Sequence, residues 1–215
     1  MSKILQITEL EFGYPRSEPL LHGVSLALER GQLIWITGPA GCGKSTLLQL
    51  ICGNLKPQSG RIEIRGIPVY GRGSWSRSYL RRELGLFRQS ETLLPERSLF
   101  ANVELPLEIR GFRKGRRRQR VVQVLRSLDL FGRASLPAAQ LSASERRLTT
   151  LARALVGSPP LILAELDSST LDRGIVLDKL REAATYGSAV VIFAAKAGGP
   201  EPEYHLAGES VVAAV

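Results

Sequence analysis

Residues 38–45 form the strongest chemical pattern in this sequence. They read Gly-Pro-Ala-Gly-Cys-Gly-Lys-Ser and fit the phosphate-binding pattern G-x-x-x-x-G-K-[ST]. The glycines let the backbone curl so that successive N–H groups point at phosphate oxygens, and a following helix adds a favourable dipole. Lys44 would reach the β- and γ-phosphates, and Ser45 would coordinate Mg²⁺. Cys42 occupies a variable loop position with no base nearby, so we do not expect it to act as a nucleophile.

The segments on both sides of this loop support that interpretation. The apolar run Leu33–Thr37 predicts a buried strand before the loop, and leucines and isoleucines over residues 47–55 mark one face of a helix after it. A phosphate loop needs this order of strand, turn and helix. The order therefore disfavours a plain glycine turn.

The rest of the chain alternates between strand and helix patterns. Strands are predicted over residues 4–12, 24–28, 61–64, 84–87, 161–164 and 189–193. The apolar period becomes helical from about residue 99 to 156, and a further helix is expected near 172–185. Continuous apolar strands separated by helices imply a parallel sheet covered on both faces. The predicted fold class is α/β with a helical insertion.

Composition describes an ordinary globular chain. With 215 residues, 44% hydrophobic and 23% charged, disorder, collagen and coiled coil are excluded. Its longest apolar run, residues 189–195, is far shorter than the ~20 residues of a membrane-spanning helix, and the N-terminus lacks the pattern of a signal peptide.

We expect Cys42 and Cys52 to lie on one helix, about 15 Å apart and too far to bridge. A reducing, cytoplasmic setting follows.

Several further residues match the motif order of a known family. Tyr14 precedes Gly38 by 24 residues, Gln89 follows the strand over residues 84–87, and Asp172 lies beyond the strand over 161–164. Residues 141–145, Leu-Ser-Ala-Ser-Glu, open a helix with capping-box spacing. From about residue 5 to 206, this order resembles the nucleotide-binding domain of an ATP-binding cassette (ABC) protein. Residues 85–89, 93–95 and 102–103 are most similar to the FtsE-like group, which includes lipoprotein-release and macrolide-export ATPases.

That resemblance implies a fold and a domain organisation. The fold would be a P-loop NTPase core of mixed β-sheet flanked by helices, with an inserted helical subdomain and an antiparallel β portion near the N-terminus. Residues 1–215 would form a single nucleotide-binding domain. Its RecA-like core would span about 1–88 and 157–215, and its helical subdomain about 89–156.

The resemblance also implies roles for individual residues. Tyr14 would stack on adenine, with a plain surface aromatic as the alternative. Gln89 would sense Mg²⁺ and the attacking water, with a polar loop residue as the alternative. Asp172 would belong to the D-loop, and Ser45, Gln89 and Glu165 would form the metal site. The residues that would hold the phosphates of ATP or ADP and Mg²⁺ are Gly38, Pro39, Ala40, Gly41, Cys42, Gly43, Lys44, Ser45 and Thr46. The signature residues Ser142, Ala143, Ser144 and Glu145 would cap the γ-phosphate bound by a partner subunit.

Partners follow from the same resemblance. Members of the family dimerise head to tail and drive an integral-membrane subunit. We therefore expect a second copy of this chain, a membrane subunit, and a peripheral position on the inner face of the cell membrane.

Three departures from the family pattern point to weak or lost hydrolysis. Counting back from Asp172 places Glu165 at the metal-side aspartate and Leu166 at the catalytic glutamate. Lys196 replaces the histidine that touches the γ-phosphate, and Ala143 and Ser144 replace both signature glycines. Losing a positioned base costs roughly 10²–10⁴ in rate. A fully working transporter ATPase remains the alternative.

Asp167 is the carboxylate closest to the altered position. It falls where the family has proline, and one step along a strand reverses the direction of a side chain. It would substitute for the missing glutamate only through a local kink.

The basic residues are concentrated in one run. Lys and Arg exceed Asp and Glu by 9, and seven basic residues lie between Arg110 and Arg120. Such a run is a solvated face, an anionic-lipid contact or a nucleic-acid patch. Each cation near an anionic leaflet contributes about 1 kcal/mol. We do not expect nucleic acid, because Phe112 is the one aromatic of the run and gives little stacking capacity.

Overall fold

A computed structural model describes residues 3–16, 18–73, 77–88, 93–166, 172–206 and 211–213. Two of the predicted site residues, Gln89 and Asp167, lie outside the described residues. Their roles therefore stay predictions.

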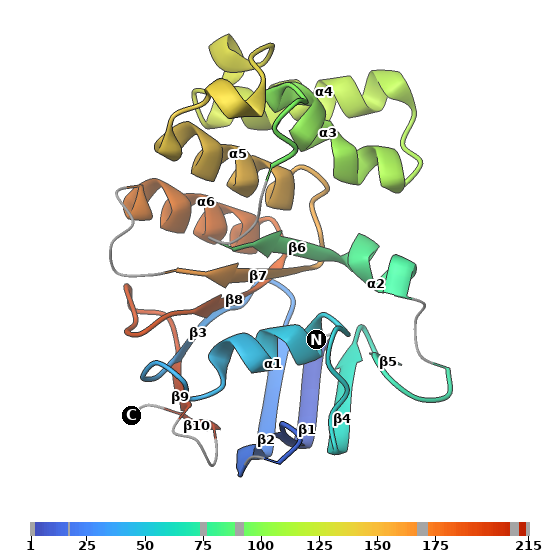
Figure 1. The fold of residues 1–215 in the computed structure, drawn as a ribbon, viewed down its shortest axis with the longest axis vertical. Helices are drawn as coiled ribbons and strands as arrows, with labels where there is room; N and C mark the ends of the chain where they lie inside the picture. Colours follow the sequence, from blue (N-terminus) through green and yellow to red (C-terminus); the bar gives the residue numbers. More distant parts are fainter. Residues whose placement is uncertain are drawn as a thin grey trace.

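A six-stranded sheet forms the centre of the molecule (Figure 1). Its order is β10 (Val211–Ala213), β9 (Glu203–Leu206), β3 (Leu33–Thr37), β8 (Ala189–Phe193), β7 (Leu161–Glu165) and β6 (Leu84–Phe87). All neighbours are parallel except β10 and β9. Every residue of β3 and β8 is buried, because elements cover both faces of the sheet. The carboxyl ends of these parallel strands lie at the left edge of the sheet in Figure 1.

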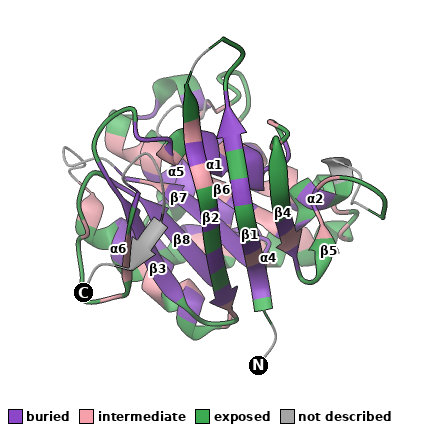
Figure 2. Cartoon of the chain, turned by 90° about the horizontal axis from the view of Figure 1, so that it is seen from below, coloured by how far each residue is buried: buried purple, intermediate pink, exposed green. Residues whose placement is uncertain are grey.

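A second, antiparallel sheet lies near the N-terminus. Its order is β2 (Pro19–Glu29), β1 (Lys3–Gly13), β4 (Ser59–Ile64) and β5 (Ile67–Pro68). Buried and more exposed residues alternate along much of β2, and along β1 except where its register with β2 shifts, as Figure 2 shows from below. This alternation follows from one face packing on the core while the other meets solvent.

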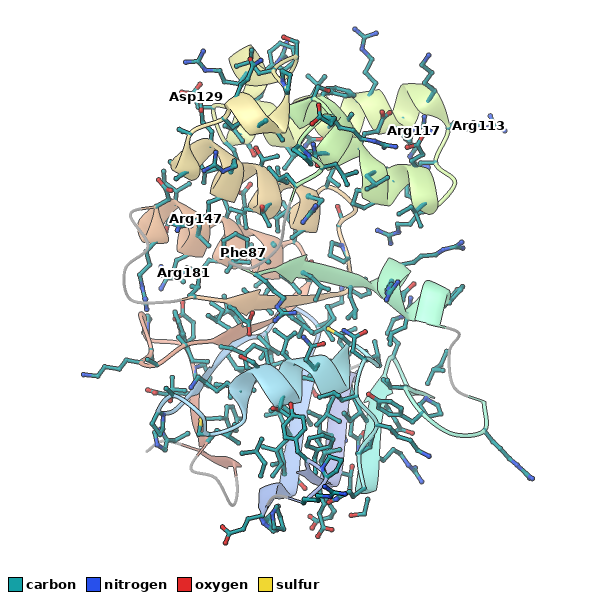
Figure 3. The ribbon with its side chains drawn as sticks, in the orientation of Figure 1. Phe87, Arg113, Arg117, Asp129, Arg147 and Arg181 are labelled. Atoms are coloured by element: carbon teal, nitrogen blue, oxygen red, sulfur yellow. The ribbon has the colours of Figure 1, made fainter. Side chains whose placement is uncertain are left out.

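The helices form layers on opposite faces of the six-stranded sheet (Figure 1). Helix α1 (Lys44–Ile51) lies between the two sheets and shares one hydrophobic cluster with both. A second cluster joins the other face to α3 (Leu99–Ile109), α4 (Lys114–Ser127), α5 (Ala143–Leu155) and α6 (Arg173–Thr185). Phe87 lies in this second cluster, beneath α5 (Figure 3). Two 3₁₀ turns, Phe131–Arg133 and Ala138–Gln140, connect α4 to α5.

The predicted α/β fold, with its antiparallel portion and its helical insertion, is confirmed. Helix α2 (Arg77–Glu83) and strands β5, β9 and β10 were not predicted, because each is short and weakly patterned. The domain boundaries remain a prediction. Among the described residues, no helix is long and apolar enough to cross a membrane.

The expectation that both cysteines share a helix is wrong. Cys42 lies in the phosphate loop before α1, and Cys52 is the C-cap of that helix. Positive φ angles at Gly41 and Gly43 keep the loop out of helical geometry up to Lys44. Both thiols are buried and free.

Candidate nucleotide site

The phosphate loop has the backbone shape that its sequence predicts. Gly38 has φ 149° and Gly43, the N-cap of α1, has φ 101°, values that L side chains rarely adopt. A Cβ on Gly43 would lie 2.8 Å from a methyl of Leu21, and one on Gly38 would collide with the carbonyl oxygen of Leu206. Both positions therefore require glycine for conformation and for space.

Lys44 holds its ammonium inside the curl of this loop. Its Nζ donates to the carbonyl oxygens of Gly38 and Pro39, both at 2.7 Å, and lies 3.5 Å from Cys42 Sγ. The cation is thus fixed among backbone groups of the loop rather than extended into solvent. This position suits a charge that meets bound phosphate.

Ser45 and Glu165 meet although 120 residues separate them in sequence. Ser45 Oγ donates to Glu165 Oε1 at 2.9 Å, at the point where β7 ends beside the first turn of α1. Glu165 Oε2 accepts from Arg88 Nε at 2.7 Å. The structure therefore brings together two of the three predicted metal ligands and adds Arg88, which the sequence analysis missed.

The residues present fit a magnesium ion bound to nucleotide. A hydroxyl and a carboxylate are hard oxygen donors, and Mg²⁺ usually takes one or two protein ligands beside phosphate oxygens and water. Among the described residues no group of three or more His, Cys, Asp or Glu side chains could hold a metal. The rest of the coordination would therefore come from phosphate and water.

Tyr14 lies beside the phosphate loop. Its hydroxyl is 3.2 Å from Thr46 Oγ1, on the first turn of α1, and its ring packs edge-on against Phe12 with centroids 5.0 Å apart. The residue is 45% exposed, so part of the ring is accessible to a ligand. Stacking on adenine stays a prediction, now with the ring placed next to the loop.

Leu166 fills the position of the expected catalytic carboxylate. It is only 4% exposed, belongs to the second hydrophobic cluster, and donates its backbone N–H to Phe193 O at 2.9 Å. Strand register places the preceding Glu165 opposite Phe193. The end of β7 therefore offers Glu165 toward Ser45 and an apolar side chain directly after it.

Lys196 follows β8 on the same edge of the sheet and is exposed. The segment after it is fixed by Glu201, whose carboxylate accepts from Trp35 Nε1 at 2.9 Å and from Arg181 Nε at 2.5 Å. Burial, the largest single influence, would raise the pKa of Glu201, but the bonds from Arg181 and Trp35, a backbone hydrogen bond and the charge of Arg181 together lower the pKa. The position where the resemblance predicts a histidine is thus occupied by a cation, and the segment after it is anchored by Glu201.

The signature residues form a helix cap, as their spacing predicts. Ser142 Oγ accepts from the backbone N–H of Glu145 at 3.2 Å, and Glu145 Oε2 accepts from the backbone N–H of Ser142 at 2.8 Å. Hydrogen bonds from the backbone N–H and the side chain of Ser142 lower the pKa of the Glu145 carboxyl, and Arg133, whose Nε lies 3.0 Å away, adds to the effect. The Ser142 hydroxyl is therefore engaged with Glu145 within the cap.

Ser144 connects the predicted signature to the predicted D-loop residue, Asp172. Its Oγ donates to Asp172 Oδ1 at 2.8 Å, joining the first turn of α5 to the N-cap of α6. The other oxygen, Asp172 Oδ2, is buried and has no hydrogen-bond partner among the described residues. Serine at this signature position therefore makes a contact that glycine cannot.

Asn102 holds the backbone of residues 94–98, within the stretch that follows Gln89 in the predicted motif. It is fully buried, and its side chain bonds the backbone N–H and carbonyl of Leu94 at 2.8 and 3.0 Å and the carbonyls of Arg97 and Ser98 at 3.1 Å. One amide thus fixes the segment that follows the predicted sensor residue. The sequence showed Asn102 only as part of a family likeness.

The basic run divides into groups with different contacts (Figure 3). Arg117 is bound to Glu104 at 3.0 Å and to the carbonyl of Phe112 at 3.1 Å. Arg110, Arg116 and Arg120 place guanidinium carbons 5.0–5.9 Å from the centre of the Phe112 ring. The ring that nucleic acid would need for stacking is therefore surrounded by cations of the chain itself.

Comparisons with known proteins agree with this geometry. The family model described as "ABC transporter" matches residues 21–170. The methionine import ATP-binding protein MetN of Nocardia farcinica is 36% identical over 181 residues, covering 82% of this chain and 54% of its own length. The ABC transporter ATP-binding protein YtrE of Bacillus subtilis is 36% identical over 162 residues, covering 74% and 70%. The chain thus spans only about half the length of MetN.

Among solved structures, the dimeric ATP-binding cassette MJ0796 bound to ADP and Pi is similar over 96% of both chains. It has a TM-score of 0.78 and 26% sequence identity.

Proposed function

This chain belongs to the ABC transporter family, and from that premise we propose that it is an ATP-binding subunit that binds Mg-ATP strongly and hydrolyses it weakly or not at all. The observation that carries the proposal is Leu166, a buried apolar residue where a water-polarising carboxylate is expected. No other described carboxylate replaces it, because Glu165 is held by Ser45 and Arg88. Binding and hydrolysis would therefore be separated in this protein.

The binding half of the site supports tight capture of a nucleotide. The N–H groups of the phosphate loop and the ammonium of Lys44 would bind the phosphates, and Tyr14 would contact the base. Ser45 and Glu165 would hold Mg²⁺, which would neutralise phosphate charge when bound. Arg88 would compete with the metal for Glu165, because it already occupies Oε2.

A second copy of the chain would complete the site. Helices α1 and α5 lie on opposite faces of the sheet (Figure 1), so the phosphate loop and the signature of one chain are held apart by the sheet. Both begin at the carboxyl edge, where a partner turned by a two-fold axis could present its signature to this loop. The dimeric cassette MJ0796 supports this arrangement for the present chain.

We further propose that the subunit couples to an integral-membrane partner on the inner face of the cell membrane and belongs to the FtsE-like group. The group assignment is based on residues 85–89, 93–95 and 102–103. The exposed cations Arg113, Lys114, Arg116 and Arg118 are the members of the basic run that could meet anionic lipid. Co-purification with a polytopic membrane protein would support the coupling, whereas a soluble nucleic-acid complex would overturn it.

Phosphate release and nucleotide binding, measured on the same purified protein, test the central proposal. We expect micromolar-range ATP binding, together with phosphate release no faster than that of a Lys44→Ala variant. Release well above that background would show a working transporter ATPase. Absence of ATP binding would overturn the binding part of the proposal.

A further inference from the structure

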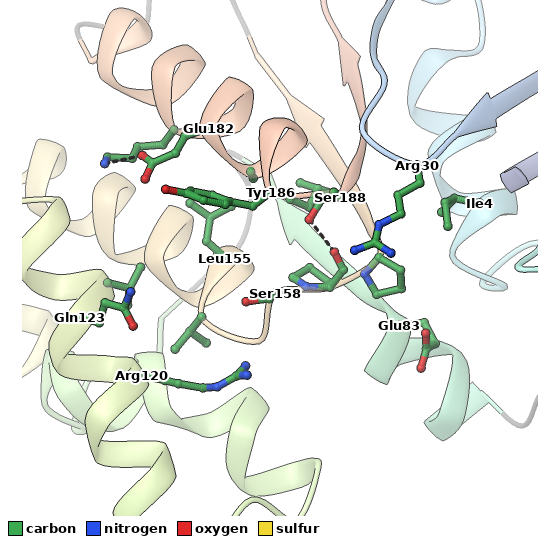
Figure 4. A pocket seen from close by; sticks show the side chains of 18 of the residues that line it. Ile4, Arg30, Glu83, Arg120, Gln123, Leu155, Ser158, Glu182, Tyr186 and Ser188 are labelled. Atoms are coloured by element: carbon green, nitrogen blue, oxygen red, sulfur yellow. Dashed lines mark hydrogen bonds and ion pairs between the residues drawn. The ribbon is translucent and has the colours of Figure 1, made fainter. Parts of the chain in front are cut away.

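A cavity of about 730 Å³ lies at the edge of the sheet opposite the phosphate loop. Glu83, Pro160 and Ser188 line it, and they directly precede β6, β7 and β8. The end of α4 and the end of α6 close its other sides, and Tyr186 stands at its rim with 79% of its surface exposed (Figure 4). Its volume is in the range of small-molecule sites.

Cations outnumber carboxylates in the lining of this cavity. Glu83 is bound to Arg65 at 2.9 Å, and Glu182 is bound to Lys179 at 2.7 Å. Both lining carboxylates are therefore already paired with cations. Arg30, Arg110 and Arg120 remain, and none of them has a carboxylate within ion-pair distance among the described residues.

Two of these three guanidiniums are held against glycine backbone. Arg110 Nη1 donates to Gly157 O at 2.9 Å, and a Cβ on Gly157 would collide with that nitrogen. A Cβ on Gly187, which has φ 98°, would lie 2.6 Å from Arg30 Nε. Side chains at these glycines would displace both arginines, so the local backbone makes room for the cations.

The third guanidinium, that of Arg120, comes from the opposite side of the cavity. Figure 4 shows Arg120 reaching in from α4 and Arg30 reaching in from the turn after β2. Arg120 is held over the Phe112 ring at 5.0 Å, which limits its freedom. Burial lowers the pKa of Arg110, Glu83 opposes that shift, and Arg120 and Arg82 add to it. Positive charge is therefore in excess here.

Arginine at three such positions indicates the chemistry of the ligand. A guanidinium donates in a planar fork that matches the oxygens of a phosphoryl group, and such charge-assisted bonds are roughly twice as strong as neutral ones. Guanidiniums on opposite walls suit a ligand with two phosphoryl groups better than a single small anion. The exposed ring of Tyr186 leaves an apolar surface for an organic part.

We propose that this cavity is a second phosphate-binding site, separate from the nucleotide site, and that Arg30, Arg110 and Arg120 bind a ligand that carries two phosphoryl groups. The group can come from a soluble diphosphate or from a lipid headgroup such as that of cardiolipin. Neither source involves the phosphate loop or Glu165.

Calorimetric titration with inorganic pyrophosphate tests the site. The full chain with Lys44→Ala serves as the background, so that the phosphate loop contributes least. We expect pyrophosphate to bind, and its affinity to fall by about tenfold or more in R30Q/R120Q. The matched control R113Q/R118Q removes the same charge from exposed arginines of the same run outside the cavity, and we expect its affinity to be unchanged. Thermal unfolding of each variant, and the single changes R30Q and R120Q, separate lost binding from lost folding.

A second titration uses vesicles of phosphatidylcholine with cardiolipin and identifies the source of the phosphoryl groups. Selective loss of vesicle binding in R30Q/R120Q, beside the loss of pyrophosphate binding, assigns the ligand to a lipid. Loss of pyrophosphate binding alone assigns it to a soluble molecule. No pyrophosphate binding in the Lys44→Ala background, or equal weakening of pyrophosphate binding in R113Q/R118Q, overturns the proposal.

Discussion

A hydrogen bond joins the phosphate loop to the end of β7. The loop matches the family pattern closely, whereas the end of β7 departs from it. The loop keeps each glycine that its backbone needs, with φ angles of 149° and 101° at Gly38 and Gly43. The strand end keeps a metal-side carboxylate in Glu165 but carries the buried Leu166 next to it. On our proposal, the two regions therefore serve different steps, the loop binding nucleotide and the strand end no longer supporting hydrolysis.

The difference follows from what each region requires of its residues. The loop is a backbone structure, and a side chain at Gly38 or Gly43 would collide with neighbours and strain the chain. The catalytic position is one side chain, and an apolar residue there joins the core without disturbing β7 or its register with β8. The proposed loss of catalysis would therefore cost little stability, whereas loss of the loop would alter the fold around α1.

The largest expected effect is on ATP affinity and comes from a substitution in the phosphate loop, the region that matches the family pattern. Lys44→Ala removes the one cation held inside the loop, so the bound phosphates would lose a charge-assisted partner. We expect ATP affinity to fall by about 100-fold, or ~3 kcal/mol. Equilibrium dialysis with labelled ATP measures the change.

Lys196→Ala is the matched control, because it removes the same charge from the segment after β8, the other position where the chain departs from the family pattern. We expect its ATP affinity to stay within about twofold of the unmodified chain, as for an exposed cation. If both variants lose affinity equally, Lys196 also binds phosphate and the two regions are not functionally separate.

Much of the fold was predictable because periodicity reports burial. The runs at β3, β7 and β8 are apolar except for the last residue of β3 and of β7, and every apolar residue in them is buried as expected. Short elements escaped prediction: β9 is held by pairing with β3 rather than by its own pattern, and α2 has only seven residues. Strand β2 begins at Pro19, earlier than alternation alone predicted, because its pairing with β1 extends to Gly13.

The site was predictable where a motif fixes backbone shape and unpredictable where partners come from distant segments. The capping box at Ser142 and Glu145 is confirmed, since its two bonds depend on a spacing of three residues. The bonds from Arg88 to Glu165 and from Ser144 to Asp172 join residues 77 and 28 positions apart, and no local pattern encodes them. The excess of arginine in the cavity likewise appears only when α3, α4 and the turn after β2 come together.

A smaller effect, on phosphate release, is expected from restoring the family's residues at positions 166 and 196. Leu166→Glu with Lys196→His restores the two side chains that the family uses, and we expect phosphate release to rise by about tenfold or more. The gain should be below the full 10²–10⁴ of a positioned base, because position 166 is buried and a carboxylate there must first reach the edge of the sheet. A coupled-enzyme phosphate assay measures it.

Leu166→Gln with Lys196→His controls for shape without adding a carboxylate. It should leave the rate at background, and thermal unfolding shows whether either variant is folded. A rapid rate in the unmodified chain that Asp167→Ala abolishes would contradict our placement of the catalytic position. In that case Asp167, and not position 166, would act on water.

The smallest effect concerns Glu165, where the two regions meet through the hydrogen bond from Ser45. Arg88 occupies Glu165 Oε2 while Ser45 occupies Oε1, so a bound Mg²⁺ must compete with a guanidinium that is itself only 23% exposed. Arg88→Gln would free that oxygen, and we expect the magnesium concentration that half-saturates ATP binding to fall about threefold, or ~0.7 kcal/mol, as for a partly solvated ion pair. Arg82→Gln, an exposed arginine of α2 beyond the other end of β6, is the matched control and should not move it. Dialysis over a magnesium series measures both variants. A rise instead of a fall would mean that Arg88 binds phosphate directly, which would assign it to the intact, nucleotide-binding side of the site.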